Sequence, residues 1–516
     1  SSRRGDELRG SDTGCGRDGR APRAGAEGGK VTSSGKGDEL RGSDTGCGRD
    51  GRAPRGEETR DAERMCYDVV VCGGGPAGCA AALAARRRGA RVLLIERLAQ
   101  CGGMGTSGLV CHWLGGRTSD TDRWVVGGLF RQLVEAAVAR GIAVLPRAAA
   151  YEDVAYSPYG QLKGLLAGVP YDPFAMTCLI EERLQAAGVE ILLQCQVLAA
   201  EGDGERIQRV TVAGKAGTFT VSAKAFVDAT GDADVAAQAG CGYVQGDEGD
   251  GDIAGVSFML QLENVDEERF MEGVIAADDP RQRKRIAALR EQGEFPYPIP
   301  IFVFVKLNRD GRFMVNGNWM PAGDATDPRW RTQALLELRG RIPDLLRVFR
   351  THAPGLAACT LRAYAADLGV RETRRIEGIS RLTVAQVQAG VDAGDAIGLS
   401  AYGWDLGGSR DRGQPMHGQH KPPVVPIPYG IMVPRDVANL VCPGRAVSVD
   451  RQVLGPLRVM APVMAMGEAA GEAAAMAAAD GIGCADVPLQ QLQQALRRAG
   501  AVLAADDLPA VDQEVV

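Results

Sequence analysis

The pattern of apolar and polar positions predicts a strand, a tight turn, a helix and a second strand across residues 67–96. Residues 69–71 are a short run of valines, typical of a strand buried on both faces of a parallel sheet. The small residues at 80–85 favour a helix, and residues 92–95 form the second apolar run. The stretch therefore predicts a strand–helix–strand unit of a parallel sheet, around which the rest of the chain is organised.

Three glycines with the G-x-G-x-x-G spacing, Gly73, Gly75 and Gly78, follow the first strand. The first permits a tight turn, the second lets the backbone approach a pyrophosphate, and the third lets helix and strand pack closely. The N-terminus of the helix directs amides and the positive dipole end at the phosphates. Glu96 lies 23 positions after Gly73, close to the roughly 20 expected for an acid that binds an adenosine ribose. The motif predicts FAD or NAD, since an acid here disfavours the 2′-phosphate of NADP.

Four later segments are expected to return to this cofactor. A glycine-rich loop at 101–108 follows Glu96, and loops at the carboxyl ends of parallel strands face the ligand; a surface loop is the alternative. Residues 225–232 predict a buried strand that ends in a Thr-Gly-Asp turn. Residues 439–444 predict another strand with a glycine turn. A helix that begins at Ala461 and ends at Gly481 points its N-terminus at the redox end of the cofactor.

Between these segments, amphipathic patterns predict helices at 127–141 and 174–187. Four alternating runs then predict a β-meander, at 189–193, 196–199, 207–212 and 218–221. From 242 to 430 the patterns change to an α+β insertion, with strands at 257–262 and 301–307 and helical character at 331–350 and 386–391. We expect this insertion to recognise the substrate.

The insertion contains a concentration of arginines at 369–376, GVRETRRI. An arginine cluster is either a solvated face or a device that grips a carboxylate or phosphate bidentately, and the sequence leaves both open.

The expected division of the chain has four parts. A tail at 1–64 repeats GDELRGSDTGCGRDGRAPR and has almost no large apolar residues, so we expect it to be disordered. The cofactor-binding domain is assigned to 65–241 and 431–486, and the substrate or cap domain to 242–430. Residues 487–516 are expected to be a frayed, acidic C-terminal tail.

Composition excludes several classes of function. The net charge of −6 gives no reason to expect nucleic acid or an anionic membrane surface as a partner, and no apolar run reaches the roughly 18 residues of a spanning helix. The 13 cysteines are scattered and never spaced C-x-x-C, which disfavours disulfides, zinc and a protein-bound iron–sulfur cluster. We expect a soluble, cytoplasmic protein without a metal; the sequence leaves open whether it is a homodimer.

Four segments together resemble FAD-dependent oxidoreductases of the glutathione reductase type-two superfamily, at 71–96, 102–108, 227–232 and 441–471. With the GVRETRRI run and PIPYGIMVP at 426–434, the chain is similar to the group that includes the flavin subunit of heterodisulfide reductase. The resemblance covers residues 67–479. It implies an α/β fold with a Rossmann-like FAD-binding domain, built from a parallel sheet plus a β-meander, and an inserted α+β substrate domain.

The resemblance also implies cofactor contacts. The pyrophosphate lies at the three motif glycines and the adenosine ribose at Glu96, while Val197 supports the adenine and Asp232 approaches the ribityl or pyrophosphate. The isoalloxazine lies by Arg458 and Met460. The cofactor-binding residues expected from these motifs are Gly73, Gly75, Pro76, Ala77, Gly78, Glu96, Arg97, Gly102, Gly103, Met104, Val197, Thr230, Gly231, Asp232, Gly444, Arg445, Arg458, Val459 and Met460.

Two features depart from this group. Relatives with iron–sulfur clusters carry them on cysteine-rich motifs, and this chain has none. The group often has a histidine shortly after an aspartate near the substrate, but here Asp405 is followed by Leu406 and Gly407. His417 or His420 is the substitute, which leaves the catalytic assignment open.

A dehydrogenation needs a base near the flavin, and the chain has only four histidines. His417 and His420 lie in a Gly- and Pro-rich stretch typical of an active-site loop, and His112 follows the glycine loop. Tyr402 is a candidate proton donor and Arg371 a candidate substrate clamp. Cys101 lacks a partner cysteine at a redox-motif spacing.

These features predict an FAD-dependent oxidoreductase, a dehydrogenase or reductase, that transfers a hydride between flavin and a small organic, perhaps anionic, substrate. The alternatives are an electron-transfer subunit that serves a partner iron–sulfur protein and a flavin-binding module without catalysis.

Overall fold

The computed structural model describes residues 65–509, apart from 119–121, 163, 164, 166, 248, 250, 252, 322, 391–393 and 407–423. The expected tail at 1–64 and the histidines His417 and His420 lie outside these residues.

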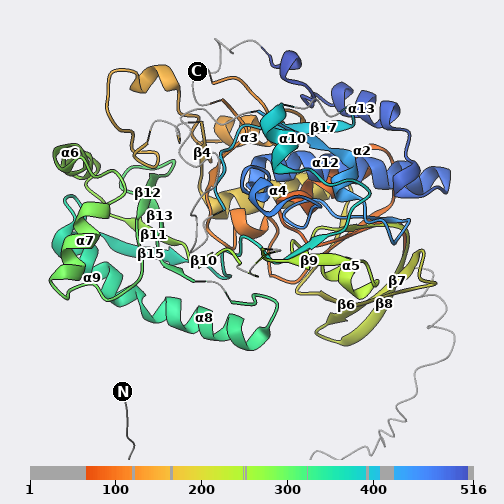
Figure 1. Ribbon diagram of the computed structural model, residues 1–516, viewed down its shortest axis with the longest axis horizontal. Helices are drawn as coiled ribbons and strands as arrows, with labels where there is room; N and C mark the ends of the chain where they lie inside the picture. The colour runs from red at the N-terminus through yellow and green to blue at the C-terminus, as the bar shows by residue number, and fades with distance from the viewer. Residues whose placement is uncertain are drawn as a thin grey trace, which may run out of the picture. The chain divides into compact units, whose positions relative to one another are not determined.

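The larger domain is built on one sheet, in the order β5-β2-β1-β8-β7-β6, with β19 also paired to β8. Figure 1 labels β6, β7 and β8 of this sheet. Strands β5, β2, β1, β8 and β19 run parallel, whereas β6, β7 and β8 form an antiparallel meander. The strands are β1 (Cys66–Cys72), β2 (Val92–Glu96), β5 (Glu190–Leu193), β6 (Gln196–Gly202), β7 (Ile207–Gly214), β8 (Gly217–Asp228) and β19 (Leu440–Val441).

Strand β8 joins the two halves of this sheet because it is 12 residues long. Its first half pairs with β7, from Gly217 opposite Gly214 to Ser222 opposite Arg209. Its second half pairs with β1, where Asp228 lies opposite Cys72 at the carboxyl edge of the sheet. The strand therefore delivers the Thr-Gly-Asp turn next to the turn that follows β1.

The central strands are buried on both faces, as the valine run predicts. Val69 and Val71 pack with the helices α2 (Pro76–Arg87) and α12 (Met460–Asp480), whereas Val70 and Cys72 face a second cluster with the meander and α5 (Asp234–Gln238). The two helices touch backbone to backbone. A Cβ on Gly467 would lie 2.2 Å from the carbonyl oxygen of Ala77, and one on Gly471 would lie 2.0 Å from that of Ala81.

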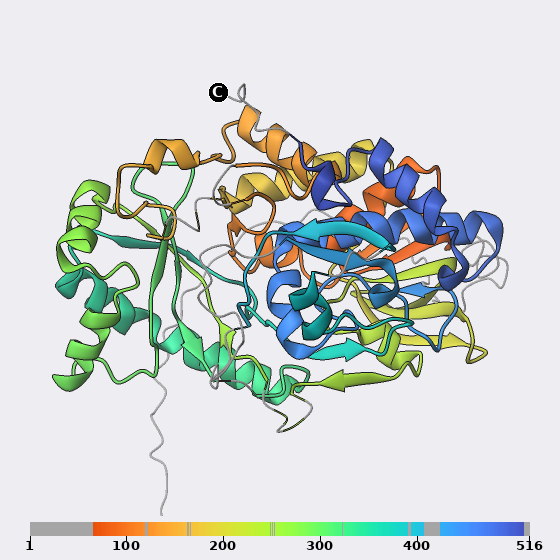
Figure 2. The same cartoon turned by 45° about the horizontal axis from the view of Figure 1, so that its top comes forward.

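The inserted domain has its own antiparallel sheet, in the order β12-β13-β11-β15, with helices packed beside it (Figures 1 and 2). Its core is rich in phenylalanine, and the ring of Phe349 on α9 lies 5.0 Å from Phe302 and 5.4 Å from Phe304. The elements are β11 (Leu260–Glu263), α6 (Glu267–Ala277), α7 (Arg283–Glu291), β12 (Val303–Lys306), β13 (Phe313–Asn316), α8 (Pro328–Gly340), α9 (Ile342–His352) and β15 (Thr360–Tyr364).

Short strand pairs and further helices complete the described part of the chain. The pairs are β3 (His112–Trp113) with β4 (Val169–Pro170), β9 (Tyr243–Gln245) with β16 (Arg374–Ile376), β10 (Val256–Ser257) with β14 (Trp319–Met320), and β17 (Ala396–Ser400) with β18 (Val425–Pro428). The helices are α3 (Gly128–Ala139), α4 (Pro173–Ala186), α10 (Val384–Ala389), α11 (Leu454–Leu457) and α13 (Leu489–Arg498).

The α/β fold, with a Rossmann-like domain and an inserted α+β domain, is confirmed. Four local expectations were wrong. The run at 189–193 is not part of the meander, because β5 adds to the parallel side of the sheet beside β2. The runs at 218–221 and 225–227 are one strand, β8. The helix expected at 331–350 is two helices, since Pro343 begins a new first turn. The expected C-terminal tail contains α13, which buries Leu492 and Leu496.

Candidate functional site

A large cavity lies where the carboxyl ends of β1, β2, β8 and β19 meet the N-termini of α2 and α12. The inserted domain closes its other side with Met259, Asn316 and Arg331. Every residue expected to contact the cofactor lines this cavity except Gly78 and Gly102, which lie behind its wall. The structure thus brings residues that are up to 390 positions apart, from Gly73 to Val463, around one cavity.

The three motif glycines have three different surroundings. Gly73 has φ +105°, a conformation that favours glycine. A Cβ on Gly78 would lie 1.8 Å from the carbonyl oxygen of Gly73, so this glycine lets the helix start directly against the turn. A Cβ on Gly75 would meet no atom within 4 Å. The chain itself has no need of a glycine at 75, so the space beside it is available to a ligand.

Backbone amides hold Glu96 in place at the wall of the cavity. Its two carboxylate oxygens accept hydrogen bonds from the amides of Gly74, at 2.6 Å, and Leu98, at 2.7 Å. The residue is buried. Each oxygen keeps a further lone pair for a ligand hydroxyl.

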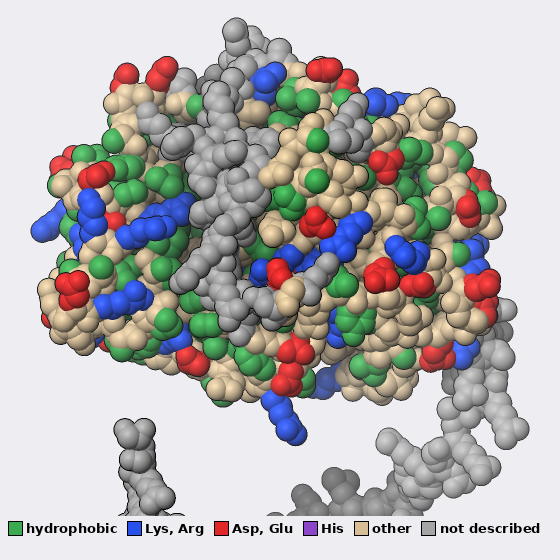
Figure 3. All heavy atoms as spheres, in the orientation of Figure 1, with side chains coloured by type: hydrophobic (Ala, Val, Ile, Leu, Met, Phe, Trp, Pro, Cys, Tyr) green, Lys and Arg blue, Asp and Glu red, His purple; other side chains and the backbone are tan. Residues whose placement is uncertain are grey.

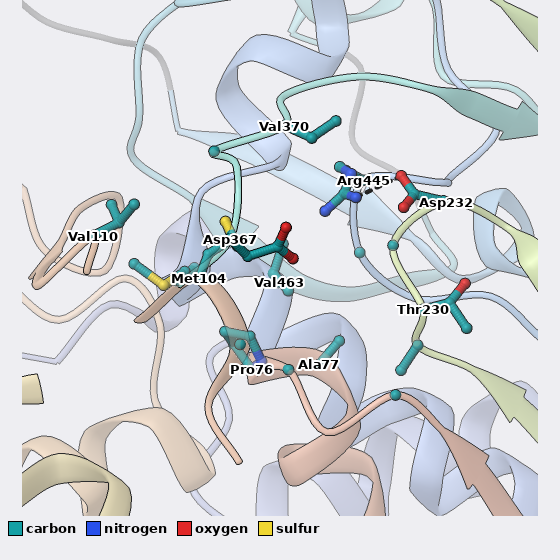
Figure 4. Close-up of a pocket in the computed structure, with 18 of the residues that line it drawn as sticks. Pro76, Ala77, Met104, Val110, Thr230, Asp232, Asp367, Val370, Arg445 and Val463 are labelled. Carbon is teal, nitrogen blue, oxygen red and sulfur yellow. Dashed lines mark hydrogen bonds and ion pairs between the residues drawn. The ribbon is translucent and has the colours of Figure 1, made fainter. Parts of the chain in front are cut away.

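Asp232 and Arg445 come from the turns after β8 and β19 and form an ion pair of 2.5 Å at the cavity wall, where Figure 4 shows them pointing toward one another. Thr373 donates a second hydrogen bond to Asp232, at 2.6 Å. Burial raises the pKa of Asp232, but Arg445 and Thr373 outweigh it and hold this pKa below its usual value. The carboxylate therefore stays charged.

Asp367 joins the two domains at the cavity. It pairs with Arg97, the residue after Glu96, and with Arg331 of α8, at 2.5 Å for the second pair. Burial raises the pKa of Asp367, but the two guanidinium groups outweigh it and keep this pKa below its usual value. Sequence reasoning missed Asp367 and Arg331, because only the folded chain shows that they pair. The one local signal was that Asp367 lies four positions before Arg371.

A second cluster lies at another part of the cavity wall, formed by Arg371, Tyr402, Asp405 and Arg458. Tyr402 Oη donates a hydrogen bond to Asp405 Oδ2 at 2.9 Å. Arg458 donates to the backbone oxygen of Asp405 at 2.5 Å, and its Nη2 lies 3.7 Å from Asp405 Oδ2. Arg371 donates to the carbonyl of Gly255 at 2.6 Å. We call this group the arginine–tyrosine cluster.

The members of the arginine–tyrosine cluster set each other's protonation. Burial and the charge of Arg458 lower the pKa of Arg371 to about 10, so it stays cationic at neutral pH. Burial and the nearby Asp405 raise the pKa of Tyr402, so the phenol stays protonated. Partial burial at the cavity wall raises the pKa of Asp405, but Arg458 and Arg371 outweigh it and hold this pKa below its usual value. The cluster is a neutral phenol and a carboxylate among cations.

The other arginines of the GVRETRRI run have structural partners. Arg374 pairs with Asp234 at 2.9 Å and donates to the carbonyl of Asp232. Arg375 is fully buried against Glu372 at 2.7 Å. Only Arg371 of the three lines the cavity.

The remaining sequence candidates are less suited to catalysis. His112 lines the cavity, but burial and Arg117 lower its pKa to about 3, so it is neutral near pH 7. His352 lies on α9 and pairs with Glu294 at 2.8 Å. Cys101 lies beside a second buried thiol, that of Cys79, which is 22 positions earlier in the sequence. A hydrogen bond with Cys101, together with burial, raises the pKa of the Cys79 thiol. Within the part of the chain that the structure describes, no three His, Cys, Asp or Glu side chains gather as a metal site.

The cavity fits the expected dinucleotide. The N-termini of α2 and α12 both reach it, through Pro76 and Ala77 and through Val459 and Met460, so two sets of first-turn amides face the space. Three buried nitrogens of its lining find no hydrogen-bond partner among the described residues: His112 Nε2, Arg445 Nε and Arg458 Nε. Open space at Gly75 leaves room beside the backbone there.

Charged side chains of both signs are intermixed over the visible face (Figure 3). No helix of the described residues is long and apolar enough to cross a lipid bilayer.

The chain was compared with curated protein sequences, with solved structures and with sequence models of protein families. No curated protein sequence matches the chain. Among solved structures, p-nitrophenol 4-monooxygenase PnpA from Pseudomonas putida DLL-E4 is similar at 13% identity and a TM-score of 0.43, over 86% of this chain and 89% of that one. The flavin-dependent brominase Bmp2 is similar at 16% identity and a TM-score of 0.42, over 83% of each chain.

The sequence model of one family, described as FAD dependent oxidoreductase, matches residues 68–496. This range contains every cavity-lining segment described above. The chain therefore belongs to the FAD-dependent oxidoreductase family, and its cofactor is FAD.

Proposed function

We propose that this enzyme transfers a hydride between the flavin and a small, anionic organic substrate. The observation that supports the proposal is the balance of charge in the arginine–tyrosine cluster. Two guanidinium groups, Arg371 and Arg458, lie with a single carboxylate, Asp405. Guanidinium groups grip carboxylates through paired hydrogen bonds, so an anionic substrate supplies the charge that the cluster lacks.

The residues of the chain have distinct tasks in this proposal. FAD, when bound, supplies the two-electron chemistry. The motif glycines, Glu96 and the two helix N-termini hold the dinucleotide. Arg371 and Arg458 bind and orient the anion, and Tyr402 presents an O–H group at the same place. The inserted domain limits the entry of water from its side of the cavity.

The test uses the purified FAD-bound enzyme under anaerobic conditions. Small carboxylic acids and their methyl esters are added, and the absorption bands of oxidised flavin are followed. We expect reduction by at least one acid and at least about a tenfold weaker response to its ester, since a charged hydrogen bond is worth about 1.5–3 kcal/mol. Equal reduction by acid and ester would contradict the anionic substrate.

The finer resemblance, to the group with the flavin subunit of heterodisulfide reductase, supports a second hypothesis. In that case the protein is an electron-transfer subunit that serves a partner iron–sulfur protein. The same anaerobic flavin-reduction experiment tests this second hypothesis. It predicts that a reduced iron–sulfur protein reduces the flavin and that none of the organic acids does.

A further inference from the structure

We propose that the substrate is a 2-hydroxy acid, or the corresponding 2-oxo acid in the reverse direction, and that its hydroxyl proton passes through Tyr402 to Asp405. This rests on the proposed function and adds to it the substrate class and a catalytic role for Asp405. The inference comes from the position of a phenol–carboxylate pair beside the two arginines.

The first step of the argument is the direction of the hydrogen bond. Tyr402 Oη donates to Asp405 Oδ2 at 2.9 Å, so the lone pairs of the phenol oxygen remain to accept a proton from a ligand. A chain from ligand hydroxyl to phenol to carboxylate is therefore aligned for proton transfer. The side chain of Asp405 is 51% exposed, so a proton that arrives there can leave to water.

The second step is that both relay residues are fixed in place. The amide of Tyr402 donates to Ser400 Oγ at 3.2 Å, and that hydroxyl donates to the carbonyl of Pro456 at 2.7 Å. Asp405 packs so closely on Gly455 that a Cβ there would lie 2.8 Å from its amide nitrogen. Pre-organised donors and acceptors need no rearrangement during a reaction.

The third step is the distance between the acid-binding group and the relay. Arg458 Nη2 and Tyr402 Oη both lie within 3.7 Å of one atom, Asp405 Oδ2. A small molecule that contacts both groups therefore needs its carboxylate close to its hydroxyl. A 2-hydroxy acid, which carries the two groups on adjacent carbons, is the simplest molecule with this arrangement.

The fourth step is charge, which separates hydroxy acids from amino acids. A 2-amino acid would bring an ammonium group to the phenol. Arg371 and Arg458 are both cationic there, and Arg281 also contributes positive charge to Asp405 and Tyr402. One carboxylate does not offset them, so a neutral hydroxyl is preferred to an ammonium group.

The reaction balances with these groups. The C2–H bond of the hydroxy acid breaks and its electron pair leaves with the hydrogen as hydride, for which flavin is the acceptor. The O–H bond breaks, its proton goes to Tyr402 Oη, and the phenol proton goes to Asp405. The electron pair of the O–H bond forms the new C=O bond. The substrate is oxidised by two electrons and the flavin is reduced by two.

The test mixes the anaerobic FAD-bound enzyme with matched sets of acids. The 2-hydroxy acids are lactate, malate, mandelate and 2-hydroxyhexanoate, and each is compared with its 2-amino and its 2-deoxy counterpart. We expect flavin reduction by a hydroxy acid only, while the deoxy acid binds and shifts the flavin spectrum without reducing it. Tyr402→Phe and Asp405→Asn should each slow reduction by about 100-fold or more, the range of a lost proton-transfer group.

A binding measurement keeps the relay distinct from a structural role. The dissociation constant of the deoxy acid should stay within about threefold in Tyr402→Phe, as for a change that removes no contact to the anion. In the wild type a solvent isotope effect on reduction should be present. Loss of deoxy-acid binding in Tyr402→Phe would assign Tyr402 to binding and overturn the relay.

The outcomes separate this inference from the proposed function. Reduction by amino acids or by deoxy acids, but by no hydroxy acid, would overturn the inference and leave the anionic substrate standing. No binding and no reduction by any acid of the three sets would contradict both.

Discussion

The cavity differs between its dinucleotide end and the arginine–tyrosine cluster in how charge is paired. At the dinucleotide end, Glu96 is held by two backbone amides, and Asp232 and Asp367 each have arginine partners. In the cluster, Arg371 and Arg458 share one half-exposed carboxylate, that of Asp405. At the dinucleotide end every one of these carboxylates has its partners, and what remains for a ligand is backbone amides and open space. The cluster has more positive than negative side-chain charge.

This difference is the basis of the proposal for what each end binds. A pyrophosphate is held by backbone amides and helix dipoles, which place no demand on side-chain charge. An organic anion that arrives and leaves in each turnover is held by side chains, because paired guanidinium hydrogen bonds give both attraction and orientation. The predictions below change one end at a time, from the largest expected effect to the smallest.

Gly78→Ala should have the largest effect, because its Cβ would lie 1.8 Å from the carbonyl oxygen of Gly73. We expect a loss of at least about 3 kcal/mol in the free energy of unfolding, the upper part of the range for overpacking, and a protein purified without FAD. The matched control is Gly75→Ala, whose Cβ meets no atom of the chain. Its apoprotein should unfold within about 0.5 kcal/mol of the wild type, but it should bind FAD about 100-fold more weakly.

The measurements are urea unfolding of the apoproteins and fluorescence titration with FAD. Equal FAD affinity in Gly75→Ala and the wild type would show that no pyrophosphate lies beside Gly75. That result would remove the main assignment at the dinucleotide end.

Asp228 should make the stability of the dinucleotide end depend on pH. Burial raises its pKa from 3.8, the ordinary value for an aspartate, to about 6, despite hydrogen bonds from Thr230 and Ala236. The folded protein therefore holds this proton more tightly than the unfolded chain. The contribution of Asp228 to the free energy of unfolding should therefore be largest below pH 4. About 2 to 3 kcal/mol of this contribution should be lost as the pH rises to 6.

Asp228→Asn is expected to remove this slope, as measured by urea unfolding between pH 4 and pH 7. Asp405→Asn is the comparison from the cluster, since the pKa of Asp405 lies below its usual value and the carboxylate stays charged across this range. An unchanged slope in Asp228→Asn would contradict the assignment of this dependence to Asp228.

Arg371→Ala should weaken binding of a carboxylate inhibitor by about 10-fold to 100-fold, since a hydrogen bond to a charged group is worth about 1.5–3 kcal/mol. FAD content should not change. Arg374→Ala is a matched control from the same run, because Arg374 pairs with Asp234 outside the cluster. Perturbation of the flavin spectrum measures the affinity. Similar losses in both variants would show that the run acts through folding rather than through anion binding.

The sequence predicted which segments line the dinucleotide end of the cavity, because the information for this end is local. Gly73, Gly75, Gly78 and Glu96 lie on one strand–helix–strand unit, and their spacing follows from that geometry. The Asp367 bridge could not be predicted, because Arg97 and Arg331 are separated by 234 positions and meet only after the inserted domain has folded.

The cluster was predicted in part, from residue type. Arg371 and Tyr402 were candidates, whereas Asp405 was noticed only for the histidine that does not follow it. The role of each depends on the others: Asp405 stays charged through Arg458, and Tyr402 finds its acceptor in Asp405. Such mutual effects are set by tertiary packing and leave no pattern along the chain.

The most direct test of the account is a crystal structure of the FAD-bound enzyme with phenylacetate, a carboxylate that lacks a hydroxyl to oxidise. The account predicts the pyrophosphate of FAD against Gly75 and the carboxylate of the ligand between Arg371 and Arg458. A carboxylate bound elsewhere, with these two arginines contacting only Asp405 and the protein backbone, would contradict it.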